Sequence, residues 1–122
     1  NDNGTAAIQG IVIKNDLFDR YRANEDFIQK YIFPGGFLPS ISFMENLIKK
    51  NNLKLEKINS YSTDYARTLA TWRENFLGVW EKISPLGFDD YFKRMWEFYL
   101  SYCEGGFKSK NIDLIQFSMS NK

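Results

Sequence analysis

Apolar residues recur along this chain with two different spacings, which predict alternating strands and helices. Residues 5–13 (TAAIQGIVI) are nearly all apolar without alternation, which predicts a strand covered on both faces, as in the parallel core of an α/β sheet. Residues 53–60 alternate imperfectly between apolar and polar positions, which suits a strand with one face in water. A third segment, residues 112–119, predicts a final strand.

Spacings of three and four residues predict the helices between these strands. Residues 16–31 have a helical pattern with an interruption near 23–24, and Ser40 is a candidate N-cap for a helix that runs to Lys50. Two long apolar stripes, at residues 65–83 and 88–106, are separated by a Ser-Pro-Leu-Gly break. We therefore expect one α/β domain over residues 1–122, in the order strand, two helices, strand, two helices, strand.

An unusual turn lies between the first two helical segments. In residues 30–40 (KYIFPGGFLPS), bulky apolar residues stand on both sides of two adjacent glycines. A turn that only connects two helices does not need them, whereas a loop that lines an apolar cavity does. The candidates for lining such a cavity are Phe33, Phe37, Leu38 and Phe43. Ordinary packing beneath the loop is the alternative.

Composition narrows the chemistry that this chain can perform. The 16 basic and 15 acidic residues nearly balance, so no excess of positive charge indicates a nucleic-acid partner. There is no histidine, which removes His-ligated zinc and His-assisted nucleophiles, and no metal site is expected. The single cysteine, Cys103, lies on an apolar stripe and is expected in the core; it fits a reducing cytosol. No apolar run approaches the roughly 20 residues of a membrane span.

Four segments of the chain carry a family resemblance. They are residues 30–40, residues 64–72 (DYARTLATW), residues 92–100 (FKRMWEFYL), and residues 103–107 (CEGGF) leading to residues 112–117 (IDLIQF). In order and spacing these segments resemble the cyclopropane-fatty-acyl-phospholipid synthase family of S-adenosylmethionine-dependent methyltransferases. Any one of them alone is a weak signal, whereas the four together are specific. The third and fourth point to the lipid-modifying branch.

The resemblance implies that this chain is the C-terminal half of a Rossmann-like class I methyltransferase domain. We expect a three-stranded mixed sheet, in the order first, third, second strand, with four to five helices. The family's glycine-rich segment that holds S-adenosylmethionine would precede Asn1, so no cofactor-binding residue is assigned here. Residues 1–122 alone are expected to be inactive. Their first strand, with one edge unpaired, is expected to form a homodimer or a swapped assembly.

The resemblance also assigns an anion site. In the family, a methyl group is transferred to a cis double bond of an acyl chain, and a bound bicarbonate removes a proton from the carbocation inside a hydrophobic tunnel. Tyr65 matches the tyrosine whose hydroxyl binds this bicarbonate, and Ile11 matches a residue that offers its backbone amide. Gln9 stands where much of the family has a histidine. It can donate a hydrogen bond but cannot titrate, which leaves cyclopropanation and plain methylation both open. The alternative for Tyr65 is a core position at the start of its helix.

The leading interpretation is therefore part of an enzyme that transfers a methyl or methylene group from S-adenosylmethionine to unsaturated acyl chains of phospholipids. It would work in the cytoplasm, peripherally at the inner membrane surface, with bicarbonate as a possible second cofactor and no nucleic-acid partner. Two alternatives stay open. One is a small-molecule N-methyltransferase of the same architecture, and the other is a non-catalytic lipid- or ligand-binding module.

Overall fold

The sheet is built around its last strand. The computed structural model describes residues 2–121, in which β3 (Ile112–Asn121) lies between β1 (Thr5–Ile13) and β2 (Leu53–Ser60). Both ladders are antiparallel. The strand order first, third, second is thus confirmed, but the expected mixed sheet is wrong. Because β1 and β2 each pair with β3, which runs the other way, no parallel ladder forms within the described residues.

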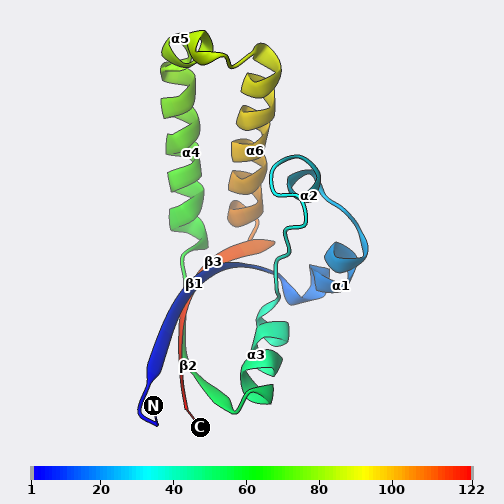
Figure 1. Ribbon diagram of the computed structural model, residues 1–122, viewed down its shortest axis with the longest axis vertical. Coiled ribbons are helices and arrows are strands. Elements are labelled where there is room, and N and C mark those ends of the chain that lie inside the picture. The colour runs from blue at the N-terminus through cyan, green and yellow to red at the C-terminus, as the bar shows by residue number, and fades with distance from the viewer. Residues whose placement is uncertain (1, 122) are drawn as a thin grey trace.

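The connections between the strands hold six α-helices and one 3₁₀ turn within residues 2–121, where four to five helices were expected. They are α1 (Asn15–Ala23), α2 (Phe27–Tyr31), α3 (Ile41–Lys50), α4 (Ser62–Gly78), α5 (Trp80–Ile83), the 3₁₀ turn η1 (Ser84–Leu86) and α6 (Asp90–Lys108). Helices α4 and α6 form a long hairpin that stands on the sheet, with α5 at its far end (Figure 1). The α/β class is as expected.

Local capping explains where the first helices begin and end. The expected interruption near residues 23–24 is confirmed, because Asp26 starts α2 as a capping box. Its carboxylate accepts from the Gln29 backbone N–H at 2.8 Å, and the Gln29 side chain accepts from the Asp26 N–H at 3.0 Å. Ser40 is also confirmed as an N-cap, since its hydroxyl accepts from the Phe43 N–H at 3.1 Å. A further break, at Val79, separates the short α5 from α4 and accounts for one extra helix.

Apolar side chains form a separate core on each face of the sheet. On one face, Val12, Ile115 and Phe117 pack with Ile48 of α3. On the other face, the hairpin supplies a second buried cluster, which we call the hairpin core. Its members are Ala66, Leu69, Leu100, Cys103 and Phe107. Cys103 is therefore a core residue as expected, and burial raises the pKa of its thiol to about 11.

Strand β1 is covered on both faces only at its carboxyl end. Val12 and Ile13 are buried, whereas residues 5–9 are exposed, and Ile8 is 43% exposed. The expectation of a strand covered along its whole length is thus wrong within residues 2–121. The hairpin extends away from the sheet rather than along β1 (Figure 1), so it covers only one end of the strand.

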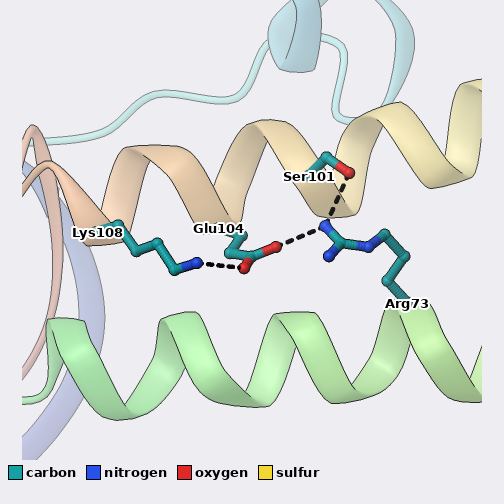
Figure 2. A network of polar contacts seen from close by, with 4 residues as sticks. All are labelled: Arg73, Ser101, Glu104 and Lys108. Atoms are coloured by element: carbon teal, nitrogen blue, oxygen red, sulfur yellow. Dashed lines mark hydrogen bonds and ion pairs between the residues drawn. The ribbon is translucent and has the colours of Figure 1, made fainter.

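A charged network fastens α4 to α6 inside the hairpin (Figure 2). The Glu104 side chain is only 10% exposed, and it accepts from Arg73 at 2.5 Å and from Lys108 at 2.8 Å. Arg73 also donates to the Ser101 hydroxyl at 3.0 Å. Hydrogen bonds from Lys108 and then Arg73 hold the pKa of Glu104 below its ordinary value, while burial opposes them. Because a buried charge without a partner is costly, the network holds the two helices in one register.

The outer edge of β1 presents unpaired backbone groups. The Lys14 N–H donates to the Asn111 carbonyl beside β3, whereas the Ile13 N–H donates to the Pro39 carbonyl on the opposite side. Because successive N–H groups of a strand alternate in direction, the odd-numbered residues of β1 direct their N–H groups away from β3. Within residues 2–121, the loop before α3 pairs with this edge at Ile13 alone. An exposed edge of this kind invites pairing with another strand.

Replacing Arg73 with methionine should lower the free energy of unfolding by about 1–3 kcal/mol, because the buried Glu104 carboxylate loses one of two charged partners. Arg67→Met, an exposed position on the same helix, is the matched control and should change stability by less than about 0.5 kcal/mol. Urea unfolding followed by circular dichroism measures both. Equal stability of the two variants would contradict a stabilising role for the network.

The stability difference between wild type and Arg73→Met should also depend on pH. A carboxyl group whose pKa is lower in the folded than in the unfolded state stabilises the fold above its unfolded pKa, and this stability is lost as the pH falls through the folded pKa. The difference between wild type and Arg73→Met should therefore be full at about pH 7 and shrink below about pH 4. A difference that stays constant down to about pH 2 would mean that Glu104 is not its source.

Proline substitutions can test the open edge of β1, where we propose that isolated residues 1–122 dimerise. Ala7→Pro removes an N–H that faces the open edge, so it should turn the dimer into a monomer and keep the fold. Ala6→Pro removes an N–H that faces β3, so it should instead destabilise the sheet. Light scattering after gel filtration gives the mass of each variant. A monomeric wild type at high concentration would rule the dimer out.

Candidate functional site

The carboxyl ends of β1 and β2 meet the amino end of β3 at one edge of the sheet, and a pocket of about 710 Å³ opens there. In open α/β sheets, ligands bind at the carboxyl ends of the strands. The floor of this pocket is apolar and consists of Ile13, Leu17, Ile28, Leu38 and Ile112. Its rim carries polar side chains from α1, the segment after it, and the end of α6.

Close contact between α6 and β3 shapes the inner wall of this edge pocket. Gly106 of α6 lies against Ile112, and a Cβ atom added to this glycine would stand 2.9 Å from the Ile112 side chain. Only glycine therefore permits the helix to end this close to the strand. Gly105 and Gly106 both line the pocket.

Backbone geometry explains the two glycines of the 30–40 loop. Gly35 has a φ of +78°, which disfavours other residues. The Gly36 N–H donates to the Phe33 carbonyl at 2.8 Å, and a Cβ on Gly36 would stand 2.9 Å from that oxygen. The loop is then held by two more bonds, from the Gln29 side chain to the Gly36 carbonyl and from the Leu38 N–H to the Tyr21 hydroxyl. These hydrogen bonds therefore hold the 30–40 loop in one conformation.

The four predicted lining residues lie in three different places. Leu38 lines the edge pocket. The rings of Phe37 and Phe43 lie 5.7 Å and 5.3 Å from buried Phe18 and 6.1 Å from each other, so they pack among aromatic side chains. Phe33 is 57% exposed, and its ring lies 6.3 Å from that of Tyr99 on α6. Phe43 therefore fits the alternative of packing beneath the loop, whereas Phe37 remains 47% exposed.

Tyr65 and Ile11 both pack against the hairpin core. The Tyr65 ring meets the Phe107 ring edge-on at 4.8 Å. The sheet register fixes where the start of α4 lies relative to β1. Ile11 lies opposite Leu114, and the Leu114 carbonyl accepts the Tyr61 N–H at 2.8 Å, one turn before Tyr65. The Ile11 N–H itself points to the open edge of β1.

Burial favours the protonated form of the Tyr65 hydroxyl. Burial, followed by the nearby Cys103 thiol, raises the pKa of Tyr65 above its ordinary value. The phenol therefore keeps its proton at neutral pH and can donate a hydrogen bond. Within residues 2–121 this hydroxyl has no hydrogen-bond partner, so its donor is available to an anion.

Gln9 lies on the same face of β1 as Ile11, but its side chain is engaged elsewhere. Its amide oxygen accepts from the Gln116 amide at 2.9 Å across the ladder. This bond provides the partner that a polar residue in an apolar strand requires. Ile11 and Tyr65 thus share one buried cluster, whereas the Gln9 side chain is paired with β3.

Several residues at this edge were not found by sequence reasoning. Tyr99 packs on the hairpin core beside Tyr65, and burial, then Cys103 and Tyr65, raise its pKa to about 12. The sequence places Tyr99 on the apolar stripe of α6. The spacing of that stripe does not distinguish a tyrosine that acts through its hydroxyl from one that only packs through its ring. The polar rim of the edge pocket was missed altogether. No spacing links its residues, which come from separate helices.

Comparisons with known proteins agree with this architecture. The family model described as "Mycolic acid cyclopropane synthetase" matches residues 1–117. Tuberculostearic acid methyltransferase UfaA1 of Mycobacterium tuberculosis is 39% identical over 95% of this chain and 27% of its own length. Cyclopropane-fatty-acyl-phospholipid synthase of Escherichia coli (strain K12) is 35% identical over 79% of this chain and 25% of its own length.

A solved structure shares the fold. Mycolic acid cyclopropane synthase CmaA1, complexed with SAH and CTAB, superposes with a TM-score of 0.84 at 24% identity, covering 98% of this chain and 45% of that one. The chain thus spans about a quarter of the length of the two curated relatives and under half of this structure. On the match of residues 1–117, this chain belongs to the mycolic acid cyclopropane synthetase family.

Proposed function

We propose that the whole protein transfers a methyl or methylene group from S-adenosylmethionine to an unsaturated acyl chain of a phospholipid. The observation that carries this proposal is the apolar-floored edge pocket in a chain of this family. The two curated relatives are named for fatty-acid methylation and cyclopropanation. A pocket of about 710 Å³ also falls in the range of roughly 300–1,000 Å³ that is usual for organic ligands.

The pocket and the predicted anion site share a buried cluster, which supports the proposal. Ile28 and Ile112 both line the pocket floor and pack against the hairpin core, which Tyr65 and Ile11 also touch. We propose that an acyl chain on this floor extends towards the hairpin core on which Tyr65 packs. The apolar walls would exclude water from a cationic centre, which is the protection that such chemistry requires.

Each residue of the anion site would have a separate role. The cofactor supplies the activated methyl group. The Tyr65 hydroxyl and the Ile11 N–H would hold a bicarbonate-type anion as hydrogen-bond donors. Gln9 cannot exchange a proton in this role, so the bound anion rather than a side chain would act as the base. The acyl chain would rest against Leu38, with Phe33 at the exposed side of the loop.

We further propose that the protein works in the cytoplasm, at the inner face of the membrane, where its lipid substrate lies. Among residues 2–121, no helix is long and apolar enough to cross a membrane. Exposed rings such as those of Tyr31 and Phe33 stand on the loop side of α2. Aromatic side chains of this kind favour the interface between water and lipid.

The whole protein, incubated with S-adenosylmethionine and vesicles of an unsaturated phospholipid, should produce methylated or cyclopropanated acyl chains. Mass spectrometry of the released fatty acids distinguishes a ring from a methyl branch. Residues 1–122 alone are the control, and they should give no product and no cofactor binding by calorimetry. Methylation of a small amine and not of lipid would favour the N-methyltransferase alternative, and absence of any product would favour a binding module.

Tyr65→Phe should reduce kcat of the whole protein by roughly 10²-fold, because one donor to the bound anion is lost at the reacting centre. The ring contacts with Phe107 and Trp72 remain, so unfolding should be nearly unchanged. Tyr91→Phe, at an exposed phenol on α6, is the control and should keep full activity. A fully active Tyr65→Phe variant would leave Tyr65 as a core residue only.

A further inference from the structure

Helix α6 carries apolar side chains on two sides, and only one of these sides packs into the hairpin core. Leu100, Cys103 and Phe107 are buried there, whereas Phe98 is 52% exposed and Tyr102 is also exposed. A helix with one face on a core normally presents polar side chains on its opposite face. The second apolar side of α6 therefore needs an explanation other than the folding of the hairpin.

The exposed rings of α6 join rings of α2 in one cluster, which we call the aromatic face and which consists of Phe27, Tyr31, Phe98 and Tyr102. The Phe27 ring centre lies 4.7 Å from that of Phe98 and 5.3 Å from that of Tyr31. Phe27 also lies 6.1 Å from Tyr102, whose ring stacks on Phe98 at 5.9 Å. A groove of about 320 Å³ opens between the two helices here. Contiguous apolar surface on a soluble chain marks a site of interaction.

Two cations border the aromatic face. Arg94 lines the groove with Phe27 and Phe98, and the Lys30 ammonium lies 5.3 Å from the centre of the Tyr31 ring. The ion pairs found among residues 2–121 include neither of these cations. No carboxylate of the described chain lines this groove. Aromatic side chains and uncompensated positive charge together suit an anionic partner.

The aromatic face borders the edge pocket. Tyr102 belongs to both, because its ring contacts Phe27 and Phe98 while it also lines the pocket. Helix α2 likewise supplies Phe27 to the groove and Ile28 to the pocket floor. A lipid surface that meets this face would therefore lie next to the pocket, and a lipid could pass between them with little of its chain exposed to water.

We propose that the whole protein docks through the aromatic face on an anionic phospholipid bilayer. The tyrosine and phenylalanine rings enter the level of the head groups, which such rings favour, and Lys30 and Arg94 meet the negative lipid surface. Contact with the apolar-floored pocket favours a lipid over an acidic protein as the partner. This inference rests on the proposed function and names the surface that meets the membrane.

The binding test sediments the whole protein with vesicles of saturated phosphatidylglycerol or saturated phosphatidylcholine, whose chains have no double bond to modify. Tyr31→Ser/Phe98→Ser should weaken binding to either vesicle by about tenfold or more, because two rings leave the interface. Lys30→Gln/Arg94→Gln should weaken binding about tenfold on phosphatidylglycerol only, because phosphatidylcholine has no net charge. High salt should remove the same advantage from wild type.

Two matched controls change exposed side chains elsewhere. Leu86→Ser removes an exposed apolar side chain at the far end of the hairpin, and Lys50→Gln removes an exposed cation at the end of α3. Both should bind vesicles as wild type does, and circular dichroism should show every variant folded. Equal losses in Leu86→Ser and in Tyr31→Ser/Phe98→Ser would place docking at the end of the hairpin and overturn the aromatic face.

An activity arm separates failure of this inference from failure of the proposed function. Both double variants should modify unsaturated phosphatidylglycerol in vesicles about tenfold more slowly, and the same lipid dispersed in a neutral detergent at nearly the wild-type rate. No product from either form, with the vesicle-binding pattern intact, would sink the proposed function and support the aromatic face. Equal vesicle binding by wild type and both double variants would overturn the aromatic face alone. A smaller mass of the ring variant in light scattering, with unchanged vesicle binding, would assign this face to a second copy instead.

Discussion

The antiparallel pairing of β3 with both neighbours is the constraint on which the rest of the structure depends. β1 and β2 have no ladder with each other, so neither face of the sheet exists until the last strand is in place. The residues of β3 alternate between α3 and the hairpin core, so this one strand joins both layers. It also orients β1 and β2 in parallel, which brings their carboxyl ends to the single edge where the pocket opens.

The hairpin of α4 and α6 positions the candidate site residues relative to the sheet. It enters from β2 and returns to β3, so its base is tied to the sheet at both ends. The Tyr61 N–H donates to the Leu114 carbonyl, which ties the start of α4 to β3. Farther from the sheet, the ion pair of Arg73 and Glu104 holds α4 and α6 in register. A shift of one helix along the other would change the positions of Tyr65 and Tyr99 relative to the sheet. Stability and site geometry therefore share the same contacts.

The edge pocket depends on segments far apart in the chain. Its floor comes from β1, α1, α2, the loop before α3 and the start of β3. Its rim comes from α1, the segment after it and the end of α6. The same pocket thus combines an apolar floor with charged and polar groups at its rim. The open edge of β1 lies beside it, with the Ile11 N–H directed outward.

The sequence by itself determined the strands, the long helices, the Ser40 cap and the buried Cys103, and through family-like blocks it led to the proposal of Tyr65 and Ile11 as anion-site residues. These follow from spacings of two and of three to four residues, and from capping groups, which each segment carries locally. Only the tertiary structure decided that both ladders are antiparallel, that the rings of Phe37 and Phe43 lie beside Phe18, and that Arg20 shares a pocket with Glu25 and Asp26. The physical reason is that such features depend on which distant segments meet, and local periodicity carries no information about that.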